Sequence, residues 1–97
     1  MPYSYLAHYA SVVNLIKSNF NPANTSIIDI GCGSGTYRDL LPEYTMDGIE
    51  VYEKYINDFR LRDRYRNIFN VNVTDYKFSG KTHNLAIMGD VLEHLSV

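Results

Sequence analysis

The chain has 97 residues, with 9 Lys and Arg against 11 Asp and Glu and a formal net charge of −2. Its 45% hydrophobic and 21% charged residues argue against intrinsic disorder, and its acidic balance argues against a dedicated nucleic-acid-binding protein, which needs a basic surface. No apolar run approaches the roughly 20 residues of a membrane span, no signal-peptide pattern opens the chain, and the single cysteine, Cys32, excludes an internal disulfide and favours a cytoplasmic location.

Helical and extended patterns alternate along the chain. Residues 4–20 carry apolar side chains at three- and four-residue spacing, which predicts an amphipathic helix that ends before Pro22. The pattern predicts further helices at 35–41 and about 52–62, a helix opening at 90–95, and strands at 26–30, 45–50, 68–73 and 84–88. Strands that alternate with helices indicate the α/β class, with a parallel sheet and right-handed crossovers.

A glycine-rich turn, Asp29-Ile30-Gly31-Cys32-Gly33-Ser34-Gly35, follows the first predicted strand. Closely spaced glycines permit positive φ angles and let the backbone approach a ligand. The helix after the turn offers unpaired N–H groups to an anionic part of that ligand. In a doubly wound sheet the turn lies at the carboxyl ends of the strands, where ligands bind. The motif therefore predicts a binding site, although glycines also occur in purely structural turns.

Glu50 ends the second predicted strand, where a carboxylate can accept hydrogen bonds from two ribose hydroxyls. The glycines run G-x-G-x-G rather than in the dinucleotide pattern G-x-G-x-x-G, and Asp29 stands two positions before the first of them. A carboxylate there disfavours a pyrophosphate and favours a ligand with ammonium and sulfonium cations. The Gly-Lys-Ser/Thr sequence of a phosphate-binding loop does not follow. These features favour S-adenosylmethionine over NAD.

Most of the chain resembles the class I S-adenosylmethionine-dependent methyltransferases. Residues 27–35 are similar to the first motif of that family, 47–50 to the second, 72–75 to the third, and 85–95 to the fourth strand and the start of the next helix. The resemblance implies a Rossmann-like parallel sheet of order 3-2-1-4 with flanking helices. Because members of the family have seven strands, residues 1–97 are expected to form a single cofactor-binding domain that is incomplete at its C-terminus.

The resemblance also implies roles for individual residues. The glycine turn would back the methionine moiety, Asp29 would order that turn and meet the amino group, and Glu50 would hold the ribose. Asp75 would approach the adenine amine, and residues 88–90 would line the methionine side. The implied cofactor-binding residues are Asp29, Gly31, Cys32, Gly33, Gly35, Glu50, Val51, Thr74, Asp75, Met88, Gly89 and Asp90. No catalytic residue is identified, because methyl transfer by direct displacement depends on positioning and needs no nucleophilic side chain; no metal is expected.

Three other features have both a functional and a structural interpretation. His94, at the predicted helix start, is either a general base or, as we favour, an ordinary helix residue. The arginine run from Arg60 to Arg66 would either contact phosphates or, as we favour, form a solvated face with local ion pairs, away from the cofactor end. Tyr37 either faces the binding pocket or packs in the core.

The predicted function is methyl transfer from S-adenosylmethionine to an acceptor that the sequence does not identify, with S-adenosylhomocysteine as the product. A small-molecule acceptor is favoured over nucleic acid, and no membrane partner is expected. The alternative is a non-catalytic module that binds S-adenosylmethionine or S-adenosylhomocysteine and is completed by a partner or a second copy. In a sheet of order 3-2-1-4 the apolar strand at 85–88 is an exposed edge, so self-association through that edge is expected.

Overall fold

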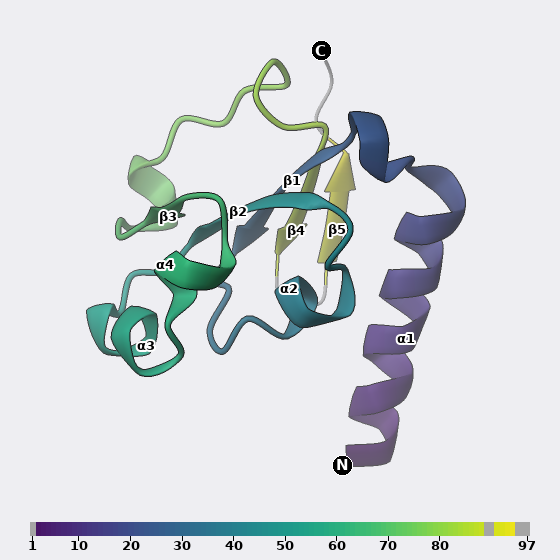
Figure 1. Cartoon of the computed structure of the whole chain (residues 1–97), viewed down its shortest axis with the longest axis horizontal. Coiled ribbons are helices and arrows are strands. Elements are labelled where there is room, and N and C mark those ends of the chain that lie inside the picture. Colours follow the sequence, from purple (N-terminus) through teal and green to yellow (C-terminus); the bar gives the residue numbers. More distant parts are fainter. Residues whose placement is uncertain (1, 89–90, 95–97) are drawn as a thin grey trace.

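A five-stranded sheet forms the centre of the structure, a computed structural model that describes residues 2–88 and 91–94 (Figure 1). The strands are β1 (Ser26–Ile30), β2 (Thr45–Ile49), β3 (Ile68–Phe69), β4 (Leu85–Met88) and β5 (Val91–His94), and they lie in the order β3-β2-β1-β4-β5. The first four are parallel, so the predicted α/β class and the order 3-2-1-4 are confirmed. The central strands are buried on both faces, as expected where a parallel sheet is covered on both sides.

The helices are α1 (Pro2–Asn19), α2 (Thr36–Leu40), α3 (Glu53–Asp58) and α4 (Leu61–Arg64), with short 3₁₀ helices at η1 (Pro22–Asn24) and η2 (Val73–Asp75). All four α-helices contribute side chains to one core cluster, on the face of the sheet that includes Ile27 and Ile87. The opposite face, with Ile28 and Ile49, packs against residues of the connection between β3 and β4. Within the described residues, no helix combines the length and the apolar character needed to cross a membrane.

The helix predicted at about 52–62 is divided into α3 and α4. Arg60 has a φ of 53° and is the one non-glycine residue with positive φ among those described. In a continuous helix, Ile56 and Leu61 would project about 140° apart, since each residue adds about 100°. The break at Arg60 brings both side chains into the same core, where they are 2% and 0% exposed. Burial of both residues accounts for the interruption.

The third strand is shorter than predicted, since β3 covers only Ile68 and Phe69 of the expected 68–73. The Asn70 side chain donates hydrogen bonds to the main-chain oxygens of Glu50 and Val51, at 2.9 and 3.0 Å. These bonds replace further backbone pairing with β2 and turn the chain away from the sheet. Residues 70–73 are thereby free to pass over the carboxyl ends of the strands.

The helix opening predicted at 90–95 is wrong for the residues that the structure describes there. Val91–His94 form β5, antiparallel to β4, with Met88 opposite Val91 and Leu85 opposite His94. A strand beside β4 satisfies the backbone groups of an otherwise open edge. The expectation that β4 is an exposed edge is therefore also wrong, and with it the basis for self-association through that strand.

Candidate functional site

The glycine turn lies between β1 and α2, at the carboxyl end of β1. Gly31, Gly33 and Gly35 all have positive φ, at 65°, 54° and 82°, a conformation that strains any residue with a Cβ. The N–H groups of Gly31 and Cys32 both donate to the Ile49 oxygen, at 2.8 and 3.1 Å, which fixes the turn to the end of β2. A Cβ built on Gly31 would meet nothing within 4 Å, so this part of the backbone is open to a ligand.

Glu50 connects the glycine turn to the loop after β2. Its Oε1 accepts a hydrogen bond of 2.8 Å from the Gly33 N–H, and its Oε2 accepts one of 3.1 Å from the Tyr52 N–H. The residue is 4% exposed, so the carboxylate is held in one position. Each carboxylate oxygen has a second lone pair, which leaves Glu50 able to accept two hydrogen bonds from a ligand.

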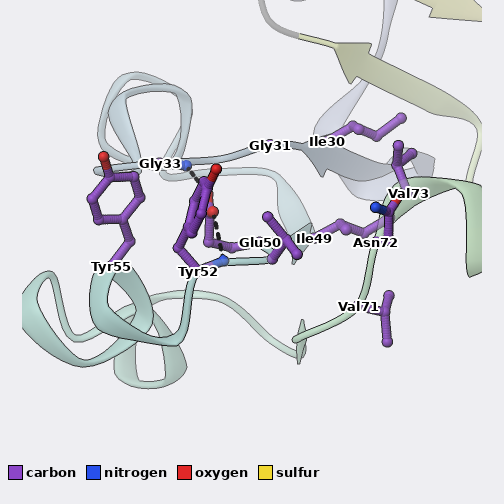
Figure 2. A pocket seen from close by; sticks show the side chains of 11 residues that line it. Ile30, Gly31, Gly33, Ile49, Glu50, Tyr52, Tyr55, Val71, Asn72 and Val73 are labelled. Carbon is purple, nitrogen blue, oxygen red and sulfur yellow. Dashed lines mark hydrogen bonds between the residues drawn. The ribbon is translucent and has the colours of Figure 1, made fainter.

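A cavity of about 450 Å³ opens beside Glu50 (Figure 2), within the range of small-molecule and cofactor sites. Its walls come from the ends of β1 and β2, from the residues after β2, and from the segment after β3. The lining residues are Ile30, Gly31, Gly33, Ile49, Glu50, Val51, Tyr52, Tyr55, Val71, Asn72 and Val73. None of these is Lys or Arg, and Glu50 is the one carboxylate among them. The cavity therefore suits an uncharged or cationic ligand with an apolar, flat part better than a phosphate.

Asp29 lies behind the turn and is not among the residues that line the cavity. It is 3% exposed, and its Oδ2 accepts a hydrogen bond of 2.7 Å from the Tyr65 hydroxyl. Burial raises the pKa of Asp29 to about 7, although the hydrogen bond from Tyr65 and the charge of Arg38 lower it. In this position Asp29 supports the turn from the core side of the sheet.

Cys32 is buried beside the same acid. Burial, together with the nearby carboxylates of Asp29 and Glu50, raises the pKa of the Cys32 thiol to about 12. A thiol with such a pKa carries almost no thiolate at neutral pH and is a poor nucleophile. Its place in the turn is explained by packing, since Cys32 belongs to the core cluster.

The prediction that the arginine run lies away from the cofactor end is wrong for Arg64. Its guanidinium donates to the main-chain oxygens of Ser34 at 2.9 Å and Gly35 at 3.0 Å, and it pairs with Asp39 at 2.9 Å. It also donates to the Phe59 oxygen at 2.9 Å, which joins the turn to the chain before α4. Arg60 does match the expected solvated ion pair, since it is exposed and lies 3.4 Å from Asp63.

Ten of the twelve predicted cofactor-binding residues lie in the described part of the chain, and they divide into two groups. Those that line the cavity are Gly31, Gly33, Glu50 and Val51, and those that the structure describes outside its lining are Asp29, Cys32, Gly35, Thr74, Asp75 and Met88. Gly89 and Asp90 lie outside the described residues. Tyr37 is 5% exposed in the core, with its ring 4.9 Å from that of Tyr9, and does not line the cavity.

Several lining residues were not predicted, and they come from segments whose path depends on tertiary contacts. In Figure 2 Tyr52 and Tyr55 lie near the Glu50–Gly33 hydrogen bond, and Val71 and Asn72 lie at the other side of the view. The position of these two tyrosines shortly after Glu50 in the sequence could have predicted that they line the same cavity. Val71 falls in a segment that the alternating pattern assigns to a strand, and Asn72 begins the third family motif, in which only Thr74 and Asp75 were assigned to the site.

No family model matches the sequence, and no curated protein matches it. Solved structures do. The plantazolicin methyltransferase BpumL in complex with SAH matches with a TM-score of 0.58 and 21% identity, over 84% of this chain and 32% of that one. A second BpumL structure, with a pentazolic desmethylPZN analog and SAH, gives a TM-score of 0.59 and 20% identity, over 87% and 34% of the two chains. The structure of StiE O-MT residues 942–1257 matches with a TM-score of 0.57 and 18% identity, over 80% of this chain and 31% of that one.

These likenesses establish the fold. The chain has the Rossmann-like fold of class I methyltransferases, as the sequence motifs predicted, and it spans about a third of the length of the chains it matches.

Proposed function

We propose that this chain binds S-adenosylmethionine and S-adenosylhomocysteine in the cavity beside Glu50 and takes part in methyl transfer from S-adenosylmethionine to an acceptor. The observation that carries the proposal is the position of the Glu50 carboxylate. It is buried, fixed by the Gly33 and Tyr52 N–H groups, and borders a cavity at the carboxyl ends of β1 and β2. Two ribose hydroxyls would donate to it.

The composition of the cavity supports a nucleoside without phosphates. Ile49, Val71 and Val73 form an apolar wall suited to a flat base, and Gly31 offers backbone without a Cβ. A pyrophosphate would need cationic side chains or several N–H donors, and the lining residues include no Lys or Arg. The carboxylate also disfavours a pyrophosphate close to it, which NAD carries and S-adenosylmethionine does not.

When bound, S-adenosylmethionine supplies a methyl group on a sulfonium, which an acceptor nucleophile attacks in line with the departing sulfur. S-adenosylhomocysteine would be the product, and a nitrogen or oxygen acceptor would lose a proton. This chain's residues would act by holding and orienting the nucleoside: Glu50 on the ribose, the glycine turn beside the methionine part, and Val51 against the base. Positioning and exclusion of water account for the rate of such reactions without a nucleophilic side chain.

The acceptor we propose is a small molecule. One BpumL structure holds a pentazolic desmethylPZN analog together with SAH, and the net charge of −2 does not favour a nucleic acid. The twelve cofactor-binding residues of the sequence analysis remain a proposal, in which Glu50, Val51, Gly31 and Gly33 have the support of the cavity lining.

Calorimetric titration of the 97-residue chain with S-adenosylmethionine, S-adenosylhomocysteine and NAD tests the proposal. We expect binding of the first two and none of NAD. Glu50→Ala should weaken S-adenosylhomocysteine binding by about 1–3 kcal/mol, the contribution of a charged hydrogen-bond acceptor. Glu53→Ala, at the exposed start of α3, is the matched control and should bind as the native chain does. Absence of heat with both adenosyl ligands, or equal affinities for the two variants, would refute the assignment.

A second measurement distinguishes an active methyltransferase from a module that only binds the cofactor. Transfer of a labelled methyl group to a panel of small-molecule acceptors would show catalysis. Tight binding with no transfer to any acceptor would favour the alternative, a non-catalytic module completed by a partner or a second copy.

A further inference from the structure

The buried carboxylate of Asp29 has a neutral hydrogen-bond partner in place of an ion pair. The Tyr65 hydroxyl, 2.7 Å from its Oδ2, is the one side-chain partner that its oxygens have in the described part of the chain. Arg38, whose charge acts on Asp29, donates instead to the main-chain oxygens of Leu41 and Tyr44, both at 2.7 Å. One neutral donor offsets little of the hydration that a buried carboxylate loses, so the ionised form is disfavoured.

Asp29 is the group in this cluster that changes its charge near neutral pH. Burial raises its pKa to about 7, the charge of Glu50 raises it further, and the hydrogen bond from Tyr65 and the charge of Arg38 oppose the rise. Burial also raises the pKa of the Cys32 thiol to about 12 and that of the Tyr65 hydroxyl above its ordinary range, so both of these groups stay neutral. The charge on Asp29 therefore responds to any further charge placed nearby.

Asp29 lies next to residues that line the cavity. It directly precedes Ile30 and Gly31, which are both lining residues (Figure 2), while its own side chain lies on the core side of the turn. No Lys or Arg is among the lining residues, so a cation bound there would meet the field of the carboxylates. Across the turn, inside the protein, two charges interact more strongly than they do in water.

We propose that Asp29 and Tyr65 make the cavity distinguish S-adenosylmethionine from S-adenosylhomocysteine by charge, because Asp29 releases its proton to the solvent when a cationic ligand binds. This rests on the proposed function, since it assumes that both ligands occupy the cavity. S-adenosylmethionine carries a sulfonium, an ammonium and a carboxylate, and S-adenosylhomocysteine lacks the sulfonium and has no net charge. The ionised Asp29 attracts the cation more, so the preference for S-adenosylmethionine grows as the pH rises.

Tyr65 sets the pH at which this preference develops. Its hydroxyl donates to the ionised carboxylate and lowers the pKa of Asp29, so without it the proton is held to a higher pH. Tyr65 follows α4 and does not line the cavity. It affects the ligand through Asp29, as a positioning residue.

Calorimetric titration in buffers of different ionisation enthalpy counts the protons released on binding. At about pH 6.5 the native chain should release about half a proton with S-adenosylmethionine and less than about a quarter with S-adenosylhomocysteine. From about pH 6 to about pH 8 its affinity for S-adenosylmethionine should rise about fivefold, which corresponds to a ligand that binds the ionised form about tenfold more tightly. The affinity for S-adenosylhomocysteine should rise less than about twofold.

Three variants assign the released proton. Tyr65→Phe should shift the proton release with S-adenosylmethionine to a pH about one unit higher, the effect of one lost hydrogen bond to the carboxylate. Asp29→Asn should abolish the release and the pH dependence of the affinity. Tyr44→Phe is the matched control, because Tyr44 is equally buried and its hydroxyl donates to the Phe20 oxygen at 2.6 Å. This variant also loses a buried hydrogen bond, but it should keep the native proton release.

Equal proton release with the two ligands, or a ratio of their affinities that is constant from about pH 6 to about pH 8, would overturn the proposal. A purely structural role of Tyr65 would weaken both ligands alike in Tyr65→Phe and leave the release at the native pH, which would overturn it as well. Should that variant not fold, native proton release in Asp29→Asn would have the same consequence. Failure of the native chain to bind either ligand at any of these pH values would instead refute the proposed function itself.

Discussion

The Tyr65 hydroxyl donates a hydrogen bond of 2.7 Å to Oδ2 of Asp29, and both side chains are buried beneath the glycine turn. Asp29 is in the central strand β1, whereas Tyr65 directly follows α4, so the bond ties the turn to a segment distant in sequence. Burial outweighs this bond and raises the pKa of Asp29 to about 7. Near neutral pH the carboxyl therefore changes its charge in the folded chain.

This shift predicts a decline in stability as the pH rises. The pKa of Asp29 is about 7 in the folded chain against an ordinary 3.8, so between these values the folded state holds a proton that the unfolded state has released. The stabilisation is complete below about pH 4 and is lost as the pH rises through about 7. The free energy of unfolding should fall by about 2–4 kcal/mol across this window. Urea unfolding at a series of pH values measures it.

Asp29→Asn tests whether the fall in the free energy of unfolding with rising pH arises from Asp29. Asparagine keeps an oxygen for the Tyr65 hydroxyl but does not titrate, so the variant should have a nearly constant free energy of unfolding between pH 5 and pH 8. A variant with the native pH dependence would show that the decline arises from another group.

Arg64 is predicted to position the glycine turn for ligand binding. Arg64→Lys keeps the charge but replaces two nitrogens in a rigid plane, one on the Ser34 oxygen and one on the Gly35 oxygen, by a single ammonium, so the turn loses a fixed contact. We expect S-adenosylhomocysteine affinity to fall about five- to tenfold, which corresponds to one hydrogen bond of about 1 kcal/mol. Asp39→Asn removes only the exposed ion pair and should change affinity by less than twofold, a small effect expected of surface pairs. Equal effects of the two substitutions, measured by calorimetry, would contradict the role of the carbonyl contacts.

The parts of the fold that sequence predicts well are those encoded locally. The glycines directly follow the apolar run of β1 and Glu50 directly follows β2, and their geometry follows from backbone rules that apply wherever such residues occur. The strand order 3-2-1-4 followed from the resemblance to a known family, and the same strands form the core of the structure.

The parts that sequence does not predict depend on contacts between distant segments. The break at Arg60 serves to bury both Ile56 and Leu61, which no helical periodicity of that segment reveals. The sequence around Arg64 predicts a surface residue, and its contact with the Ser34 oxygen depends on the fold, since the two residues are 30 positions apart. For β5 the sequence carries a local signal, since a Gly-Asp pair after an apolar run is typical of a hairpin, but the residue pattern and the family resemblance both favoured a helix start there.

Two glycines of the turn should differ in their response to alanine. Both have positive φ, which costs an alanine about 1–2 kcal/mol. At Gly31 a Cβ meets open space, whereas at Gly35 it would lie 2.5 Å from Nη2 of Arg64 and force the guanidinium from its carbonyl partners. Gly35→Ala should therefore destabilise the chain by about 1–2 kcal/mol more than Gly31→Ala. Thermal and urea unfolding measure the difference.

Removal of the Arg64 side chain tests whether its clash with the added Cβ causes the difference between the two alanine variants. In an Arg64→Ala background the contact is gone, so Gly35→Ala and Gly31→Ala should have similar costs, within about 0.5 kcal/mol. Persistence of the difference would mean that the clash is not its cause.

Asp47 is predicted to be the most important buried charge for stability. Its carboxylate accepts from Arg66 at 2.7 and 3.0 Å, from Asn67 at 3.2 Å and from the buried His83 at 2.8 Å. Burial alone would raise the pKa of Asp47, but the hydrogen bonds from Arg66 and His83 outweigh it, so the pKa lies below its ordinary 3.8. The resulting stabilisation is present above about pH 4 and is lost as the pH falls through the folded pKa.

Asp47→Asn places an amide N–H₂ against groups that donate, and it should lower the free energy of unfolding by about 2–3 kcal/mol. This is less than the 3–5 kcal/mol of a fully buried pair, because Arg66 is half exposed. The variant should also lose the decline in stability below pH 4. Asp58→Asn, which removes only the exposed pair with Lys54, is the control and should change stability by less than about 0.5 kcal/mol. Equal effects of the two substitutions in urea unfolding would show that the buried cluster does not stabilise the sheet.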